Sequence, residues 1–103
     1  MRIVAIKTLK QFYADHPEAK GALLAWNEEV SKTDWRSPNE LKAQFGKASL
    51  IGAKRVVFNI HGNAFRLIVD VEYKFKMVFV IWFGSHKEYD KINAHEIKFD
   101  KAD

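Results

Sequence analysis

The chain has 103 residues, enough for one domain that buries its own core without disulfides or metals. It is 48% hydrophobic, 14% aromatic and 29% charged, which excludes a disordered chain. The absence of cysteine excludes disulfides, thiol catalysis and thiolate metal sites. The net charge is +4, and residues 42–87 carry eight basic side chains against two acidic ones. This field attracts polyanions, nucleic acid first among them, although a basic surface that only keeps the protein in solution explains the same charge.

No stretch of the sequence predicts targeting or membrane insertion. The longest apolar run, residues 77–83, has seven residues, whereas a membrane-spanning helix needs about 20. The apolar run at residues 3–6 is too short for the core of a signal peptide. We therefore expect a single domain over residues 1–103, located in the cytoplasm and without a membrane partner.

The first half of the chain predicts a short strand followed by helices. Residues 2–6 are rich in β-branched side chains, which favours a strand. Residues 8–16 follow helical spacing, and Pro17 suits the first position of a second helix. The buried stripes expected on these two helices are Leu9, Phe12, Tyr13 and His16, then Ala19, Leu23, Trp26 and Val30. We expect a helical hairpin that packs on an apolar surface.

A third, short helix is predicted to begin at Pro38, with Ser37 as its cap. Ser37 and Glu40 have the spacing of a capping box, and Pro38 is tolerated in the first turn. Gly46 is placed to close this helix.

From residue 53 onward the hydrophobic period changes to two, which is typical of strands. Gly62 and Asn63 both tolerate a positive φ and predict a tight turn between strands 53–61 and 64–73. A two-residue turn places three pairs opposite one another, namely Asn59 with Arg66, Val57 with Ile68, and Arg55 with Asp70. A second turn near residues 74–75 leads into a strand at 77–83 that is apolar on both sides and so central or covered.

This register separates the two faces of the predicted sheet. One face is wholly apolar and should receive the helices: Val56, Phe58, Ile60, Phe65, Leu67, Val69 and Val71. The other face should be an open, cationic surface that holds Arg55, Asn59, His61 and Arg66. Phe79, Ile81 and Phe83 alternate along the last strand and serve either the core or a partner. The fold class is therefore α+β, with two to three N-terminal helices on one face of a twisted, mainly antiparallel sheet.

The segment after the last strand gathers side chains that can carry chemistry. His86 can transfer protons, Lys87 can hold a phosphate, and Tyr89 offers a proton or a stacking face. Asp90 is placed to orient His86 or to cap a turn. The alternative is a charged turn or short helix over residues 86–94, with Tyr89 packed on the core edge and Asp90 paired with Lys91. As a bare motif this structural alternative is the stronger of the two, and the polar stretch from Lys98 is expected to fray.

Arg66 is the strongest candidate for an anion site. It lies in the middle of a strand on the predicted open face, opposite an asparagine and not a carboxylate. Arg55, in contrast, has a structural explanation in Asp70. His86 and Asp90 lack a third ligand at a sensible spacing, and the five glycines form no phosphate loop or dinucleotide turn, so no metal and no cofactor are predicted.

Three segments of the second half carry a family resemblance: residues 55–60, RVVFNI; residues 62–67, GNAFRL; and residues 83–90, FGSHKEYD. Together they resemble the HigB family of type II toxin–antitoxin toxins. The last segment is close to that family's terminal T-H-K-E-Y-D motif, with Ser85 in place of threonine. The resemblance covers nearly the whole chain, although the first forty residues match more in pattern than in identity.

The resemblance implies a RelE-like fold and a ribosome-dependent endoribonuclease that cuts messenger RNA during translation. The reaction it implies is attack of the RNA 2′-hydroxyl on the adjacent phosphate, without a metal. It also implies a helix-turn-helix antitoxin of the HigA type that neutralises the toxin. The complex would repress its own operon, so that DNA is contacted only through the antitoxin.

Within this expectation the catalytic residues are Arg66, His86, Tyr89 and Lys87. Arg66 would hold the scissile phosphate, His86 is the first choice for proton transfer, and Tyr89 is the second. The residues expected to bind RNA or add charge are Lys54, Arg55, Asn59, His61, Asn63 and Asp90. Two alternatives stay open: a module that binds RNA or the ribosome without cutting, and an inactive toxin homologue that only binds its antitoxin.

Overall fold

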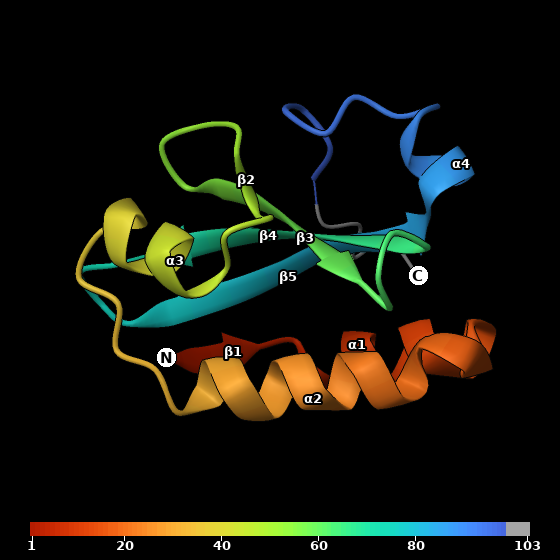
Figure 1. Cartoon of the computed structure of the whole chain (residues 1–103), viewed down its shortest axis with the longest axis horizontal. Coiled ribbons are helices and arrows are strands. Elements are labelled where there is room, and N and C mark those ends of the chain that lie inside the picture. Colours follow the sequence, from red (N-terminus) through yellow and green to blue (C-terminus); the bar gives the residue numbers. More distant parts are fainter. Residues whose placement is uncertain (99–103) are drawn as a thin grey trace.

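The computed structural model describes residues 1–98 and has two layers, with two long helices on one face of a five-stranded sheet (Figure 1). The expectation for the stretch from Lys98 onward falls almost entirely outside the described residues. The elements follow in the order β1 (Arg2–Val4), α1 (Ile6–Asp15), a 3-10 turn (Pro17–Ala19), α2 (Lys20–Ser31), α3 (Pro38–Gln44), β2 (Ser49–Leu50), β3 (Arg55–Ile60), β4 (Phe65–Glu72), β5 (Met77–Ser85) and α4 (His86–Tyr89).

The sheet has the strand order β1-β5-β4-β3-β2. Only β1 runs parallel to its neighbour, β5, and the other neighbouring pairs are antiparallel. The expected α+β class with a mainly antiparallel sheet is therefore confirmed, and so is the internal position of the last long strand. The two-residue strand β2, which pairs with Val56 and Val57 at the edge, was not predicted.

The N-terminal helices form as expected, with shifted boundaries. Helix α1 ends at Asp15 because His16 precedes a proline and adopts a non-helical backbone, with φ −130° and ψ 74°. Pro17 opens a short 3-10 turn, and the α-helical bonding of α2 begins only at Lys20. The predicted stripe on α2 is confirmed, since Leu23, Trp26 and Val30 are buried.

Helix α3 begins at Pro38 as predicted, but the expected caps are wrong. The Ser37 hydroxyl makes no capping hydrogen bond, and the Glu40 carboxylate accepts instead from the backbone N–H of Arg36 at 2.9 Å. The helix ends at Gln44, with Phe45 as its C-cap. Gly46 lacks the positive φ of a left-handed cap, so it does not close the helix.

The register between β3 and β4 is the predicted one. Arg55 pairs with Asp70, Val57 with Ile68, and Asn59 with Arg66. The turn differs in detail, because the left-handed residues are His61 (φ 56°) and Gly62 (φ 64°) and not Gly62 and Asn63. The backbone N–H of Ala64 closes this turn by donating to the carbonyl of His61 at 3.2 Å.

The main core lies between the sheet and the helices, as expected. All seven residues of the predicted apolar face are buried there, together with Val78, Val80 and Phe83 of β5. A β-bulge interrupts the alternation of β5, because Ile68 pairs with Trp82 whereas Val69 pairs with Val80. Phe83 therefore faces the helices, while Phe79 is 36% exposed on the opposite face. The expectation that Phe79, Ile81 and Phe83 share one face is wrong for this reason.

The face of the sheet away from the helices is half covered. Val57 and Ile68 are buried on it under a second cluster, which includes Ile51, Tyr89, Ile92, Ala94 and Ile97. Arg55 holds the C-terminal part of this cluster against the sheet, because its Nη1 donates to the carbonyls of Ala94 and Ile97 at 2.8 and 2.7 Å. The expectation of an open cationic face therefore fails at the Arg55 end and is met only at the Arg66 end.

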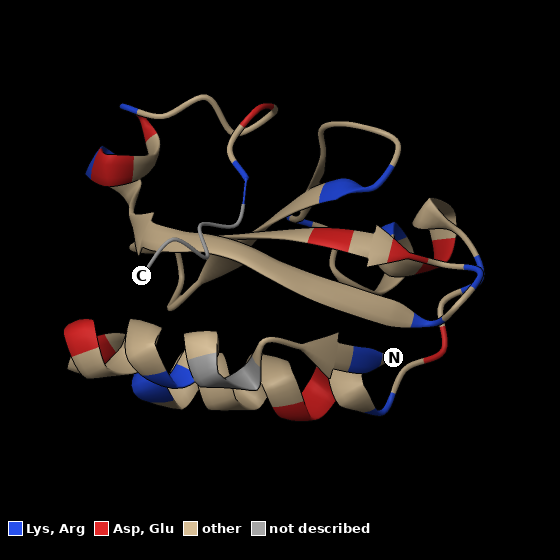
Figure 2. Ribbon diagram, turned by 180° about the vertical axis from the view of Figure 1, so that it is seen from behind, with Lys and Arg blue, Asp and Glu red and all other residues tan. Residues whose placement is uncertain are grey.

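Charged residues are spread over both layers. Figure 2 shows Lys and Arg interleaved with Asp and Glu along the helices, the strand ends and the loops. Within residues 1–98, no helix combines the length and the apolar character needed to cross a membrane.

Candidate active site at the β4–α4 corner

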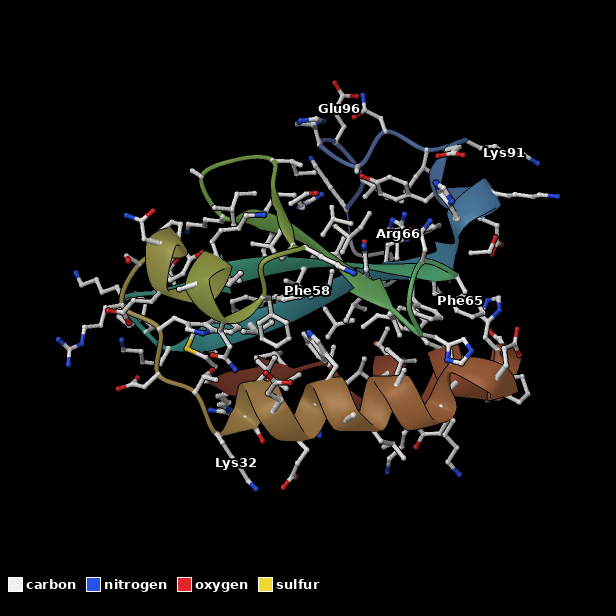
Figure 3. All side chains as sticks on the ribbon, in the orientation of Figure 1. Lys32, Phe58, Phe65, Arg66, Lys91 and Glu96 are labelled. Carbon is white, nitrogen blue, oxygen red and sulfur yellow. The ribbon has the colours of Figure 1, made fainter. Side chains whose placement is uncertain are left out.

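Arg66 stands on the open part of the sheet as the second residue of β4, so it lies at the start of the strand and not in its middle as expected. Figure 3 shows its side chain on the side away from the helices, whereas Phe58 and Phe65 lie between the sheet and the helices. Its neighbours across the sheet are Asn59 on β3 and Gly84 on β5. Neither neighbour carries a charge, so Arg66 has no cross-strand ion pair.

The guanidinium of Arg66 is held by neutral acceptors. Nη1 donates to the carbonyl oxygens of Asn63 and Phe65, both at 3.1 Å, and Nη2 donates to Asn63 Oδ1 at 2.7 Å. Cζ lies 5.9 Å from the centre of the Tyr89 ring, within the range of a cation–π contact. No carboxylate among the described residues forms an ion pair with it, so its positive charge remains available to a bound anion.

Helix α4 begins with a complete capping box. Ser85 Oγ accepts from the backbone N–H of Glu88 at 3.1 Å, and the Glu88 carboxylate accepts from the backbone N–H of Ser85 at 2.8 Å. That backbone hydrogen bond is the main cause that lowers the pKa of Glu88 below its ordinary value. The Ser-x-x-Glu spacing of residues 85–88 is the sequence signature of this capping box, which was not predicted at this position. Part of the SHKEYD segment is thus explained by helix initiation.

His86 lies at the first position of α4 and is tied to the β3–β4 turn. Its backbone N–H donates to the carbonyl of Ala64 at 3.0 Å. Its Nε2 lies 3.7 Å from Asp90 Oδ1, one helical turn further on, and both side chains are about half exposed or more. Asp90 therefore stands beside His86, as expected, and the alternative ion pair with Lys91 is not formed among the described residues.

Tyr89 connects the site to the second cluster. Its ring centre lies 6.4 Å from that of Trp82, and the two rings are tilted by 49°. The half-buried Tyr89 thus packs at a core edge, as the structural alternative predicts, while it also lies near the Arg66 guanidinium. The two interpretations of this residue are compatible.

Gly84 and Trp82 adjoin the candidate site, and neither was among the site residues predicted from the sequence. A Cβ atom on Gly84 would lie 2.5 and 2.7 Å from two ring carbons of Trp82, and 3.2 Å from Glu88 Oε1. The indole ring therefore lies against the bare backbone of Gly84, next to the strand position of Arg66. Gly84 falls within the segment that carries the resemblance, and this was the available signal.

The structure divides the sequence-predicted residues into two groups. The first group lies around the β4–α4 corner and consists of Arg66, Asn59, Asn63, His86, Lys87, Tyr89 and Asp90. The second group lies elsewhere. Arg55 is four pairs along β3, about 13 Å from the Asn59–Arg66 pair at the usual strand rise. Lys54 is paired with Glu72, whose carboxylate raises the pKa of that lysine.

His61 is directed toward the helix side of the sheet. Its ring centre lies 6.5 Å from that of Phe65, a residue of the helix-side core, and it borders a hollow of about 290 Å³ with Trp26 and Phe45. The left-handed backbone of His61 ends the strand alternation and explains this direction. The expectation that His61 shares the face of Arg66 is therefore wrong, although the residue stays next to the turn that carries Asn63.

The corner combines the groups that a phosphodiester reaction requires. A fixed guanidinium can bind a phosphate oxygen pair, and the phenol ring of Tyr89 lies 5.9 Å from it. The imidazole of His86, a possible proton carrier, stands at the start of α4. A carboxylate lies within reach of the imidazole.

Comparisons with known proteins point in the same direction. Residues 19–92 match the profile of a protein family described as "HigB_toxin, RelE-like toxic component of a toxin-antitoxin system". The chain is 30% identical over 104 residues to the mRNA interferase toxin HigB of Escherichia coli K12, an alignment that covers 98% of this chain and 100% of the relative. The mRNA interferases HigB of Escherichia coli O157:H7 and Shigella flexneri match to the same extent. The matched region includes the whole β4–α4 corner.

Proposed function

The chain belongs to the HigB toxin family of RelE-like toxin–antitoxin components, and we propose that it is an endoribonuclease that cleaves messenger RNA on translating ribosomes. The observation that carries this proposal is Arg66, a hydrogen-bonded guanidinium without a carboxylate partner among the described residues. It stands within one corner of the fold together with His86 and Tyr89.

The proposed reaction uses the nucleophile that RNA itself carries. The 2′-oxygen attacks the adjacent phosphorus, the bond from phosphorus to the 5′-oxygen breaks, and the products are a 2′,3′-cyclic phosphate and a 5′-hydroxyl end. Negative charge accumulates on the two non-bridging oxygens during the attack. Arg66 would bind these oxygens, because a guanidinium can donate two parallel hydrogen bonds to them.

Two protons must move in this reaction. We propose that His86 accepts or donates one of them, assisted by Asp90, and that Tyr89 serves as the second group or as a stacking surface for a base. Such proton transfers contribute roughly 10²–10⁴-fold to a rate. Lys87, exposed on α4, would add charge next to the phosphate.

We propose that the other predicted residues line the path of the RNA backbone or act on it through their charge. Asn59 and Asn63 flank Arg66, and His61 borders the same turn. Lys54 and Arg55 are paired with carboxylates, and Arg55 lies about 13 Å from the Asn59–Arg66 pair, so we propose that both act only through the electrostatic field.

The proposed partners are the messenger RNA on the ribosome and a helix-turn-helix antitoxin of the HigA type. DNA would be contacted only through that antitoxin, and the proposed location is the cytoplasm. The family description supports an antitoxin partner.

The test is primer extension on a defined message incubated with purified protein, with and without translating ribosomes. Cuts that need ribosomes and vanish in Arg66→Ala support the proposal. Cuts on free RNA keep the nuclease and overturn the ribosome dependence. No cuts from folded protein overturn the nuclease and leave a binding module or an inactive toxin. For a pure binding module, Arg66→Ala should change only affinity, with the salt slope on a single strand falling by about 0.7 for the lost contact.

A further inference from the structure

The hydrogen bonds of Arg66 leave one edge of its guanidinium open. A guanidinium has five N–H donors. Nη1 donates to the carbonyl oxygens of Asn63 and Phe65, and Nη2 donates to Asn63 Oδ1. The Nε–H donates to no described residue. The edge formed by Nε and Nη2 therefore carries two N–H donors that no described residue uses.

Asn63 occupies the opposite, terminal edge of the same group. Its backbone carbonyl accepts from Nη1 at 3.1 Å and its side-chain Oδ1 accepts from Nη2 at 2.7 Å, so a single residue holds both terminal nitrogens. The two oxygens of Asn63 accept from both terminal nitrogens, as the two oxygens of a carboxylate would, but Asn63 carries no charge. The guanidinium is thus fixed in orientation without losing its charge to an ion pair.

The turn that carries Asn63 is itself well determined. His61 and Gly62 adopt left-handed backbone conformations, and the N–H of Ala64 returns to the carbonyl of His61. The carbonyl of Ala64 accepts from the backbone N–H of His86 at 3.0 Å, so the turn is also joined to the start of α4. Asn63 therefore keeps a constant position relative to both Arg66 and His86.

We propose that Asn63 is a positioning residue, which aims Arg66 so that the Nε–Nη2 edge faces the phosphate of a bound RNA. The proposal rests on the proposed function, and it gives Asn63 a different role from direct RNA binding. A side chain that binds RNA directly would act independently of Arg66. A side chain that aims Arg66 would act only while an arginine is present at position 66.

The test is a double-mutant cycle measured as kcat and KM for cleavage of a message programmed on ribosomes. We expect Asn63→Ala to lower kcat roughly tenfold with little change in KM, in line with couplings measured between contacting residues. In the Arg66→Lys background Asn63→Ala should not lower kcat further, because lysine has no guanidinium whose orientation Asn63 could fix. Asn63→Asp keeps the Oδ1 acceptor but adds a negative charge that would pair with the guanidinium, so it should hold Arg66 in place and yet lower kcat at least as much as Asn63→Ala does. Asn39→Ala, at an exposed position on α3, is the matched control.

Other outcomes would overturn the positioning role. If Asn63→Ala raises KM and the effects of the two substitutions multiply, Asn63 binds RNA directly. If Asn63→Asp keeps the native kcat, a charged partner on Arg66 does not impair cleavage, and the neutral hold that Asn63 is proposed to provide has no role. Absence of cleavage by the unmodified protein would overturn the proposed function instead.

The orientation can also be measured without cleavage. The Nε–H order parameter of Arg66, obtained by NMR, should fall in Asn63→Ala and stay near the native value in Asn63→Asp. An unchanged value in Asn63→Ala would contradict the restraint itself.

Discussion

Replacing Gly84 with alanine should move the side chains on which the proposed site depends. The new Cβ would lie 2.5 and 2.7 Å from the Trp82 ring, closer than carbon atoms approach in folded proteins. The ring must therefore shift, and Tyr89, which packs 6.4 Å from it, must follow. Overpacking of this kind destabilises a protein by about 1–3 kcal/mol. Alanine also restricts the unfolded chain more than glycine does, which stabilises the folded state by about 0.4–1 kcal/mol. We expect a net loss of about 1–2 kcal/mol in the free energy of unfolding.

The matched control is Gly21→Ala on α2. A Cβ at Gly21 meets no atom within 4 Å, and alanine favours a helix over glycine by up to about 1 kcal/mol. The same chemical change should therefore stabilise the protein at Gly21 and destabilise it at Gly84. Urea denaturation followed by circular dichroism measures both, and message cleavage should fall only in the Gly84 variant.

The reasoning would be refuted by a Gly84→Ala protein as stable and as active as the native chain. A second check uses Trp82→Leu, which removes the ring atoms that the new methyl group would meet. Gly84→Ala should cost less stability in that background than in the native one. Equal costs in the two backgrounds would mean that the indole ring is not the source of the strain.

Three further predictions concern the elements around the site. Ser85→Ala should destabilise the protein by about 1 kcal/mol through loss of the α4 cap, whereas Ser85→Thr should keep it, as thermal melts would show. The pKa of Glu88 is lowered on folding, so its contribution to stability is present above the unfolded-state value and is lost as the pH falls through the folded-state value. Glu88→Gln should therefore flatten the acid limb of a plot of stability against pH, and an unchanged limb would contradict this. Arg55→Met should cost about 1.5–3 kcal/mol and make residues 92–97 more susceptible to limited proteolysis, because it removes hydrogen bonds to Asp70 and to that segment.

The parts of the fold that the sequence predicted are those governed by local rules. The pairing of β3 with β4 followed from a period of two and a short turn, because a slip of one residue would expose every core side chain. The α2 stripe followed from helical spacing in the same way. Arg66 was identified by the same argument, since the register alone placed an asparagine opposite it.

The parts that were missed depend on contacts between distant residues. Arg55 was expected on an open face, but it binds carbonyls 39 and 42 residues further along the chain. No periodic pattern in the segment after α4 indicates that it folds back over Val57 and Ile68. The direction of His61 was missed for a different reason, because it depends on which two of three turn residues become left-handed.

The β-bulge in β5 links the core to the proposed site. If the same sequence continued in strict alternation without a bulge, Trp82 and Phe83 would lie on the opposite faces from those observed. Phe83 would then leave its stack with Phe12 and Phe65 in the main core, and Trp82 would leave the space against Gly84. The bulge therefore places Phe83 in the helix-side core and Trp82 on the Arg66 face. Because the bulge is set by the packing on both faces at once, a sequence pattern for one strand does not reveal it.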